Sequence, residues 1–223
     1  MTTSLATEQT SRRTRPLTAL FGLVLVALVA RFAFLAWEPP FDPENGLRYD
    51  DLRAVAGLYW PANLYVGGPA FLVTWLGTAA FLAILGRSRV LALIGSVLVA
   101  AGGIVFSFVI VAEALPYAYA VDPGLVDELA GRALVDTINR GSAGLFPTIV
   151  GTQIVIGFGV TLGLICVLVV RSTPRWFPIV GLAYVVAFFA LPLDQLGSGA
   201  VLVSEIVQAA VLAGIGWFAL QKV

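Results

Sequence analysis

The chain has 223 residues and a formal net charge of zero, and 59% of its residues are hydrophobic while only 12% are charged. Soluble globular domains average about 45–50% apolar and about 25% charged residues, so the composition excludes an ordinary soluble domain. We expect an all-α integral membrane protein with one membrane domain. The sequence has no His and a single Cys166. This excludes an internal disulfide, Ser-His or Cys-His catalysis and a metal site built on His or several Cys residues.

Six segments are long and apolar enough, or nearly so, to cross a membrane as helices. Such a helix needs about 20 residues to cross about 30 Å of hydrocarbon, and the fifth segment is the shortest. The predicted spans are Leu17–Trp37, Asn63–Leu85, Val90–Leu115, Ile149–Val170, Phe177–Leu193 and Ala200–Leu220. The expected fold is therefore a bundle of six transmembrane helices over residues 17–223, preceded by a basic tail over residues 1–16.

The first segment also has features of a signal peptide, namely a basic start followed by an apolar core. However, Arg31 and the bulky Phe32 follow that core, where a small-residue cleavage site would be required. We therefore expect this segment to remain in the chain as a membrane span.

Basic residues predict the orientation, because they concentrate in cytoplasmic loops. The residues expected on the cytoplasmic side are Arg12, Arg13, Arg15, Arg87, Arg89, Arg171, Arg175 and Lys222. The opposite side is acidic and has two long loops, residues 38–62 and 116–148. We therefore expect a multi-pass protein of a bacterial plasma membrane with both termini in the cytoplasm and the long loops outside.

The second long loop contains a stretch that predicts an amphipathic helix. Asp122 is expected to cap this helix, Pro123 to be its first residue and Gly141 to end it. The apolar face is expected to consist of Leu125, Leu129, Ala133 and Ile138. Residues 49–60 of the first long loop predict a weaker segment of the same kind.

Three interpretations of the outer segments remain open. They are a lid that packs on the bundle, a surface that binds a protein partner or gates a ligand, or a calcium site. The calcium site would use Asp42, Glu44, Asp50 and Asp51, although their spacing differs from that of an EF-hand loop.

Three ionisable residues, Arg31, Glu113 and Glu205, lie inside apolar segments and in the outer half of the expected membrane. A charged side chain in hydrocarbon costs about 2.5–3.5 kcal/mol on insertion scales, so it usually faces the bundle interior and finds a partner. Further polar residues in the same half are Asn63, Gln153 and Gln208. We expect a polar cluster that opens outward, in which Arg31 pairs with Glu113 or Glu205.

Each of the three residues also has a structural interpretation. Arg31 would extend to the outer interface beside Trp37, and Glu113 would lie among lipid headgroups at the end of its helix. Glu205 would form a structural salt bridge instead of binding a ligand or a proton.

Helical spacing places small and polar residues on shared faces of three spans. The expected stripes are Gly95, Gly102, Phe106 and Glu113 in the third span, Gly159 and Gly163 in the fourth, and Glu205, Gln208, Leu212 and Gly216 in the sixth. Glycines allow close approach of a neighbouring helix, so these faces are expected to point into the bundle.

The last third of the chain carries a Pro-Arg-Trp motif, a following Gly, and a Glu ahead of a Trp in the last span. The residues are Pro174, Arg175, Trp176, Gly181, Glu205 and Trp217. In this pattern residues 168–222 resemble the bacterial membrane family described as domain of unknown function 4386. The resemblance implies a six-span bundle and implies no activity. From the residues alone, Arg175 and Trp176 are expected to anchor the chain at the cytoplasmic interface.

The sequence thus leads to three hypotheses of function. The first is a non-enzymatic membrane protein, such as a small permease, whose polar cluster binds a small ligand, a lipid headgroup or a proton. The second is an accessory or scaffold protein whose acidic outer loops bind a protein partner. The third is an enzyme that uses Glu113 and Glu205 as acid and base on a lipid. Apart from the calcium interpretation of the outer acidic residues, nothing in the sequence indicates a metal site, and nothing indicates a cofactor or a nucleic-acid partner.

Overall fold

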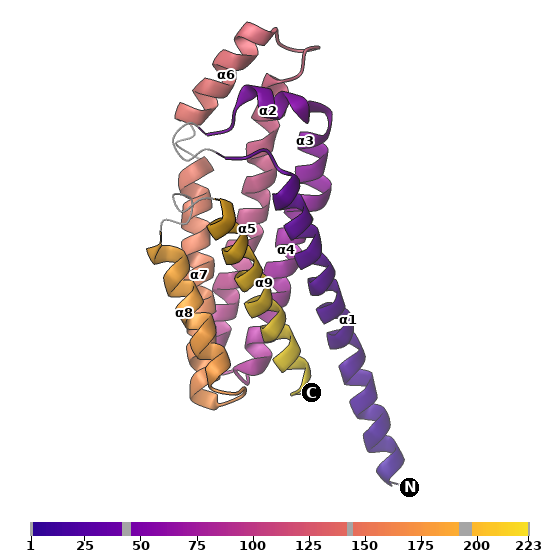
Figure 1. Ribbon diagram of the computed structural model, residues 1–223. Helices are drawn as coiled ribbons and strands as arrows, with labels where there is room; N and C mark the ends of the chain where they lie inside the picture. Colours follow the sequence, from indigo (N-terminus) through magenta and orange to yellow (C-terminus); the bar gives the residue numbers. More distant parts are fainter. Residues whose placement is uncertain (1, 42–45, 142–144, 192–197, 223) are drawn as a thin grey trace.

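The computed structural model describes residues 2–41, 46–141, 145–191 and 198–222. These residues contain helices and no strand (Figure 1). The helices are α1 (Thr2–Trp37), α2 (Tyr49–Ala54), α3 (Ala56–Ala62), the π-helical η1 (Asn63–Gly67), α4 (Gly68–Leu85), α5 (Val90–Ala120), α6 (Glu128–Gly141), α7 (Leu145–Val170), α8 (Trp176–Ala190) and α9 (Ser198–Leu220). The all-helical fold class expected from the sequence is therefore correct.

Five stretches of helix are long and apolar enough to cross a membrane, which indicates a multi-pass membrane protein. They are Arg15–Trp37, Ala56–Leu85, Val90–Ala120, Pro147–Val170 and Gly199–Leu220. The fifth predicted span corresponds to α8, which has 15 residues and a length of about 22 Å. This helix is shorter than a full crossing requires, so the six-span bundle stays a prediction.

Two of the membrane-crossing stretches are longer than predicted by more than one helical turn. The helix of the second span begins at Ala56 and not at Asn63, because α3, η1 and α4 follow one another without a break. The third span continues to Ala120 and not to Leu115. Its extra turn contributes Tyr117, which is buried in a second core outside the main bundle. This burial favours continuation of the helix.

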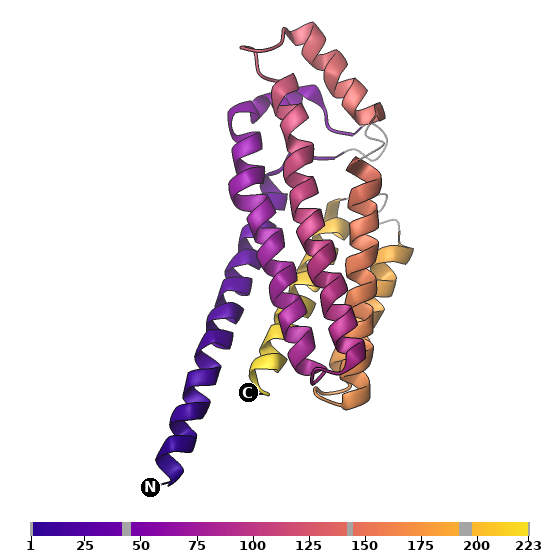
Figure 2. The ribbon, with the colours of Figure 1, turned by 180° about the vertical axis from the view of Figure 1, so that it is seen from behind.

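The long helices form a closed ring in the order α1, α4, α5, α7, α8 and α9, with α9 returning to α1. Helices α4, α5 and α7 lie side by side behind α8 and α9 in Figure 1, and Figure 2 shows the same three from the other side. Contact between α4 and α9 crosses the ring, where Gly216 approaches the rings of Phe21 and Phe81. The ring is therefore filled at the end near the C-terminus.

Glycines allow close contact between α5 and α7. The sequence predicted close approach of a neighbouring helix at these glycines and did not identify which helix it would be. A Cβ atom on Gly95 would lie 2.6 Å from the Gly159 carbonyl oxygen, and one on Gly159 would lie 2.7 Å from that of Gly95. Gly102 faces the backbone oxygen of Thr152 in the same way. The two backbones therefore approach more closely than any larger residues would permit.

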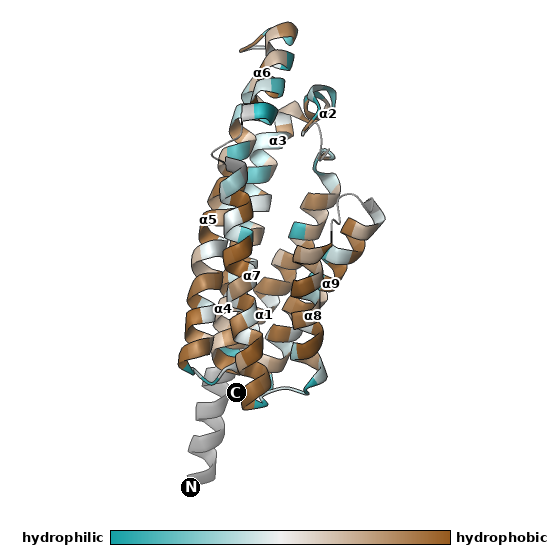
Figure 3. Cartoon of the chain, turned by 90° about the vertical axis from the view of Figure 1, so that its left-hand side faces the viewer, coloured by the Kyte–Doolittle hydropathy of each residue, from teal (hydrophilic) through white to brown (hydrophobic). Residues whose placement is uncertain are grey.

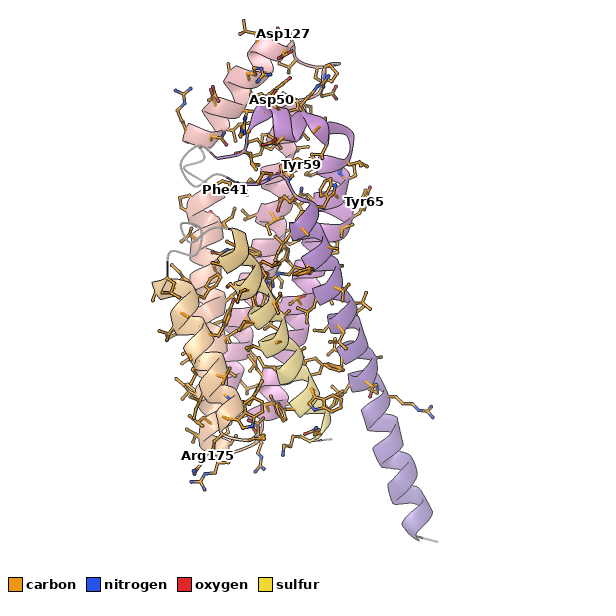
Figure 4. The ribbon with its side chains drawn as sticks, viewed as in Figure 1. Phe41, Asp50, Tyr59, Tyr65, Asp127 and Arg175 are labelled. Atoms are coloured by element: carbon orange, nitrogen blue, oxygen red, sulfur yellow. The ribbon has the colours of Figure 1, made fainter. Side chains whose placement is uncertain are left out.

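The two ends of the bundle differ in character, as the hydropathy colouring in Figure 3 shows. We call the end that carries α2, α3 and α6 the capped end. We call the opposite end, which carries Arg87, Arg89, Arg171, Arg175 and Lys222, the basic end. In Figure 4, Asp127 lies at the tip of the capped end and Arg175 lies at the basic end.

At the capped end, helix α6 begins later than the sequence predicted. It starts at Glu128 and not at Pro123. The side chain of Asp127 accepts a hydrogen bond of 2.9 Å from the backbone N–H of Ala130, so Asp127 caps the helix. Asp122, the expected cap, instead closes the preceding turn by accepting a 2.8 Å bond from the N–H of Gly124.

The later start also changes the face that α6 buries. Leu125 and Leu129 of the predicted apolar face are 58% and 81% exposed, and Ala133 is exposed as well. Only Ile138 of the predicted face packs against the second core, beside the buried Val135. The neighbouring Gly131, not considered in the sequence analysis, faces the Ala120 carbonyl and sets this orientation. Hydrophobic periodicity alone could not reveal this backbone contact.

Polar contacts connect α6 to the first long loop. The side chain of Asn139 donates a 2.9 Å hydrogen bond to the Leu47 carbonyl and accepts one of 2.8 Å from the Tyr117 hydroxyl. Arg132 pairs with Asp50 at 2.5 Å and lies 4.5 Å above the Tyr49 ring. The two outer segments therefore pack together on the end of α5, which favours the interpretation as a lid.

Candidate functional site

A cavity of about 1020 Å³ lies inside the helix ring, between its middle and the capped end. All six long helices contribute to its wall, together with α3 and η1. Most of the wall is apolar, and its large aromatic residues include Phe34, Phe71, Trp75, Phe106, Phe188 and Phe189. The polar side chains form two groups, one around Arg31 and one around Glu113.

The first polar group is centred on an ion pair between α1 and α9. The Nη2 atom of Arg31 donates a 2.8 Å hydrogen bond to Oε2 of Glu205. The same atom donates to Oε1 of Gln208, one helical turn further along α9. Arg31 is 6% exposed, so it does not extend to the interface beside Trp37. Of the two partners proposed for Arg31, the structure therefore selects Glu205.

The amide of Gln208 is oriented by two further residues that the sequence analysis did not identify. Its Nε2 atom donates a 3.0 Å hydrogen bond to the hydroxyl of Tyr184 on α8. That hydroxyl lies 3.3 Å from Oγ of Ser204. Because the amide nitrogen is committed to Tyr184, the amide oxygen faces Arg31. The predicted stripe on α9 therefore points into the bundle, with Leu212 buried behind it.

Two aromatic rings of α4 lie against the guanidinium group of Arg31, which belongs to α1. Its Cζ atom lies 4.6 Å from the centre of the Phe71 ring and 5.6 Å from that of Trp75. Stacking of this kind is a favourable cation–π contact in a desolvated site. Nevertheless, Nε and Nη1 of Arg31 and Nε1 of Trp75 have no hydrogen-bond partner among the described residues.

The second polar group lies closer to the capped end and contains Glu38, Glu113, Tyr59 and Asn63. Burial and the nearby Glu113 carboxylate raise the pKa of Glu38 to about 7. Tyr59 lies within electrostatic range of both carboxyl groups. Glu113 was expected from the sequence to be near Arg31 or among headgroups. It lines the same cavity without a hydrogen bond or ion pair to Arg31 in the described part of the chain.

The remaining predicted polar residues also line the cavity. Gln153 contributes from α7. Asn63, which is 1% exposed, donates a 3.0 Å hydrogen bond to the Tyr59 carbonyl at the start of the π-helical turn. π-Helical turns are rare and frequently occur at functional sites. The structure thus places every predicted polar residue on the wall of one cavity. All of them except Gln153 belong to one of two separate groups.

The calcium interpretation gains no support from the residues that the structure describes. Asp50 pairs with Arg132, and Asp51 lies 4.0 Å from Arg48. Asp42 and Glu44 fall outside the described residues. In the described ranges no group of three or more acidic, His or Cys side chains is arranged to hold a metal ion.

The two expected interface anchors lie at the basic end. Arg175 is exposed there, as Figure 4 shows. Trp176 is 60% exposed, and its ring contacts those of Phe177 and Phe218 edge-on. These positions leave the anchoring role a prediction, because it depends on where the membrane surface lies.

Sequence reasoning missed Tyr184, Ser204, Trp75, Tyr59 and Glu38 as members of the site. A Tyr inside an apolar span is a usable signal, since a buried hydroxyl normally has a hydrogen-bond partner. Glu38 is the first residue of the predicted outer loop 38–62 and was not singled out from it. The contribution of Trp75 depends on the packing of α4 against α1, which no local pattern indicates.

No family model, curated protein or solved structure matches the chain. The resemblance of residues 168–222 to the family described as domain of unknown function 4386 therefore stays a prediction.

Proposed function

We propose that the protein is a non-enzymatic, multi-pass membrane protein that binds an amphipathic small molecule in the cavity of its helix ring. The observation that carries this proposal is the buried Arg31 group on the wall of a large, mainly apolar cavity. Ligand pockets are typically about 300–1,000 Å³, mostly apolar, with a few convergent polar groups. The cavity of about 1020 Å³ lies at the upper limit of that range.

The proposed topology follows the distribution of charge. Both termini would be cytoplasmic in a bacterial plasma membrane, because the basic end carries Arg87, Arg89, Arg171 and Arg175. The capped end would then face outward, and the cavity would open toward that side. Helix α8 would form a short sixth span. A small permease is one protein class that fits an outward-facing site of this kind.

Binding is tested with the full chain purified in a steroid-based detergent, which has no alkyl chain to compete for the cavity. Saturable binding of tritiated single-chain amphiphiles is measured by scintillation proximity. Ile110 of α5 lines the cavity, so Ile110→Trp is expected to weaken binding about tenfold or more. Val105 on the same helix is 43% exposed and does not line the cavity, which makes Val105→Trp the matched control.

The proposal fails if no amphiphile binds saturably to the folded wild-type chain. It also fails if Ile110→Trp, shown to be folded, binds as well as Val105→Trp. Acid–base catalysis by Glu113 and Glu205 stays a prediction, and would require lipid turnover that Glu113→Gln abolishes.

A second candidate function is attachment of a protein partner at α6. The observation in its favour is the exposure of Leu125 and Leu129, which flank the acidic Asp127 in the sequence. Asp127 lies at the tip of the capped end in Figure 4. Under this alternative, Leu129→Ser would abolish co-purification of a specific partner and Ile110→Trp would not. Binding of amphiphiles that responds to Ile110→Trp alone would contradict it.

A further inference from the structure

The unsatisfied polar atoms around Arg31 are all hydrogen-bond donors. Nε of Arg31 carries one N–H group, Nη1 carries two, and Nε1 of Trp75 carries one. None of them has a partner in the described part of the chain, and both side chains line the cavity. Buried donors are normally paired. The missing partner is therefore a hydrogen-bond acceptor, and oxygen atoms are the usual acceptors.

The charges on the cavity wall select among oxygen-bearing groups. Arg31 is already paired with Glu205, and two more carboxyl groups, Glu38 and Glu113, line the same cavity. A carboxylate or phosphate headgroup would add negative charge to a wall on which acidic groups already outnumber the single guanidinium. An ammonium headgroup offers no acceptor and would lie against the Arg31 charge. An uncharged oxygen-bearing group adds no negative charge to the wall, is not repelled by Arg31 and can accept hydrogen bonds.

The apolar part of the wall determines the rest of the ligand. Phe71 and Phe106 stack edge-on at 5.1 Å beside Arg31, and the wall continues to Val211 and Leu212 on α9. Such a surface favours a hydrocarbon chain. The volume corresponds to that of ordinary small-molecule pockets, so we expect one chain and not two.

We propose that the cavity binds a single-chain lipid with an uncharged headgroup, whose ester or hydroxyl oxygens accept hydrogen bonds from Arg31 and Trp75. This inference rests on the proposed function and adds the chemical class of the ligand. It assigns Nε and Nη1 of Arg31 to the ligand, while Nη2 holds Glu205 and Gln208.

The test compares three probes with the same chain: tritiated 1-oleoylglycerol, oleate and oleylamine. All are measured on the full chain in the steroid-based detergent at pH 7.5. The neutral 1-oleoylglycerol is expected to bind about tenfold more tightly than either charged probe. Arg31→Lys keeps a cation opposite Glu205 but removes the guanidinium donors, so it should weaken 1-oleoylglycerol binding about tenfold.

A second variant removes a single donor with less risk to folding. Trp75→Phe keeps an aromatic ring on the wall and loses Nε1–H, so it should weaken 1-oleoylglycerol binding about threefold. The matched control is Trp60→Phe on α3, because Trp60 does not line the cavity. Trp60→Phe should leave the binding of all three probes unchanged. Trp75→Phe should weaken the binding of oleylamine less than that of 1-oleoylglycerol, because the ammonium group accepts no hydrogen bond.

Tighter binding of oleate or oleylamine than of 1-oleoylglycerol would overturn the inference and leave the proposed function standing. The same holds if Trp75→Phe and a folded Arg31→Lys both bind 1-oleoylglycerol as the wild type does. Failure of all three probes to bind would instead overturn the proposed function itself.

Discussion

Arg31 and Glu205 form an ion pair 2.8 Å long although 174 residues separate them in the sequence. The pair joins α1 to α9, the first and last helices of the ring. The side chain of Arg31 is 7% exposed and that of Glu205 is 23% exposed. The first and last spans are therefore connected by charge as well as by apolar packing.

Removal of either partner should destabilise the protein more than removal of both. Loss of one member of a buried ion pair costs about 3–5 kcal/mol, because the other charge stays buried and unpaired. We expect the lower end of this range for Glu205→Leu, since Glu205 is partly exposed. The double variant Arg31→Met with Glu205→Leu should recover part of the loss. Denaturant unfolding of all three variants gives the coupling free energy.

An exposed ion pair provides the control for this cycle. Asp50 and Arg132 lie 2.5 Å apart at the capped end, with side chains 61% and 43% exposed. Asp50→Asn should change the free energy of unfolding by less than about 1 kcal/mol. Additive effects of the two changes in the Arg31–Glu205 cycle would contradict a coupled pair.

Stability should fall as the pH rises from about 4.5 to about 7 because of Glu38. Its pKa is raised to about 7 in the folded chain by burial and by Glu113, whereas an unfolded Glu titrates near 4.3. The folded state therefore holds the proton more tightly in this range, and stability decreases with pH. Because Glu38 is partly exposed, we expect the free energy of unfolding to decrease by an amount on the order of 2 kcal/mol over this pH range.

The measurement is the melting temperature of the wild type, Glu38→Gln and Asp136→Asn between pH 4.5 and pH 8. Glu38→Gln should flatten the profile and gain relative stability above pH 7. The exposed Asp136→Asn should keep the wild-type slope. Equal slopes for wild type and Glu38→Gln would show that Glu38 titrates normally.

Close packing of α5 and α7 should be sensitive to a single methyl group. A Cβ atom on Gly159 would lie 2.7 Å from the Gly95 carbonyl oxygen and 2.9 Å from the Val99 nitrogen. Gly159→Ala should therefore destabilise the protein by about 1–3 kcal/mol. Gly151 on the same helix has no atom within 4 Å of such a position. Gly151→Ala should be neutral or stabilising by up to about 1 kcal/mol.

The readout is again the free energy of unfolding in detergent, measured for both alanine variants in parallel. A similar loss in the two variants would indicate a general intolerance of α7 to alanine. That result would contradict a specific contact between α5 and α7.

The position of α6 should depend on Val135, which is 1% exposed, and not on the exposed Ala133. Val135→Asp places a charge in the second core and should release α6 from the end of α5. Hydrogen exchange of residues 128–140 should then increase, with little effect on α7. Ala133→Asp should leave the exchange unchanged. Protection that survives Val135→Asp would mean that the polar contacts of Asn139 alone hold α6.

The sequence predicted the helical fold class and most of the polar residues of the cavity. Arg31, Glu205 and Gln208 were identifiable because charge and amide groups inside apolar helices need partners. The glycines of α5 and α7 were identifiable from their spacing. Both predictions rely on residue type and on helical periodicity, which can be read from a short stretch of sequence.

The parts that the sequence could not predict depend on contacts between distant segments. Helix α6 buries Gly131 and Val135 because Gly131 meets the backbone of α5 at Ala120. Tyr184 enters the site only because α8 packs beside α9.

The π-helical turn η1 acts as a one-residue insertion in an otherwise regular helix. Each α-helical residue turns by about 100°, so Tyr59 and Phe71, twelve positions apart, would face directions about 120° apart. The wide turn absorbs one position and reduces this angle to about 20°, and both residues reach the same cavity. Deletion of one residue within 64–67 would restore the regular helix and rotate Tyr59 away from the cavity. The length of η1 thus determines how many side chains of the stretch Ala56–Leu85 can face the cavity.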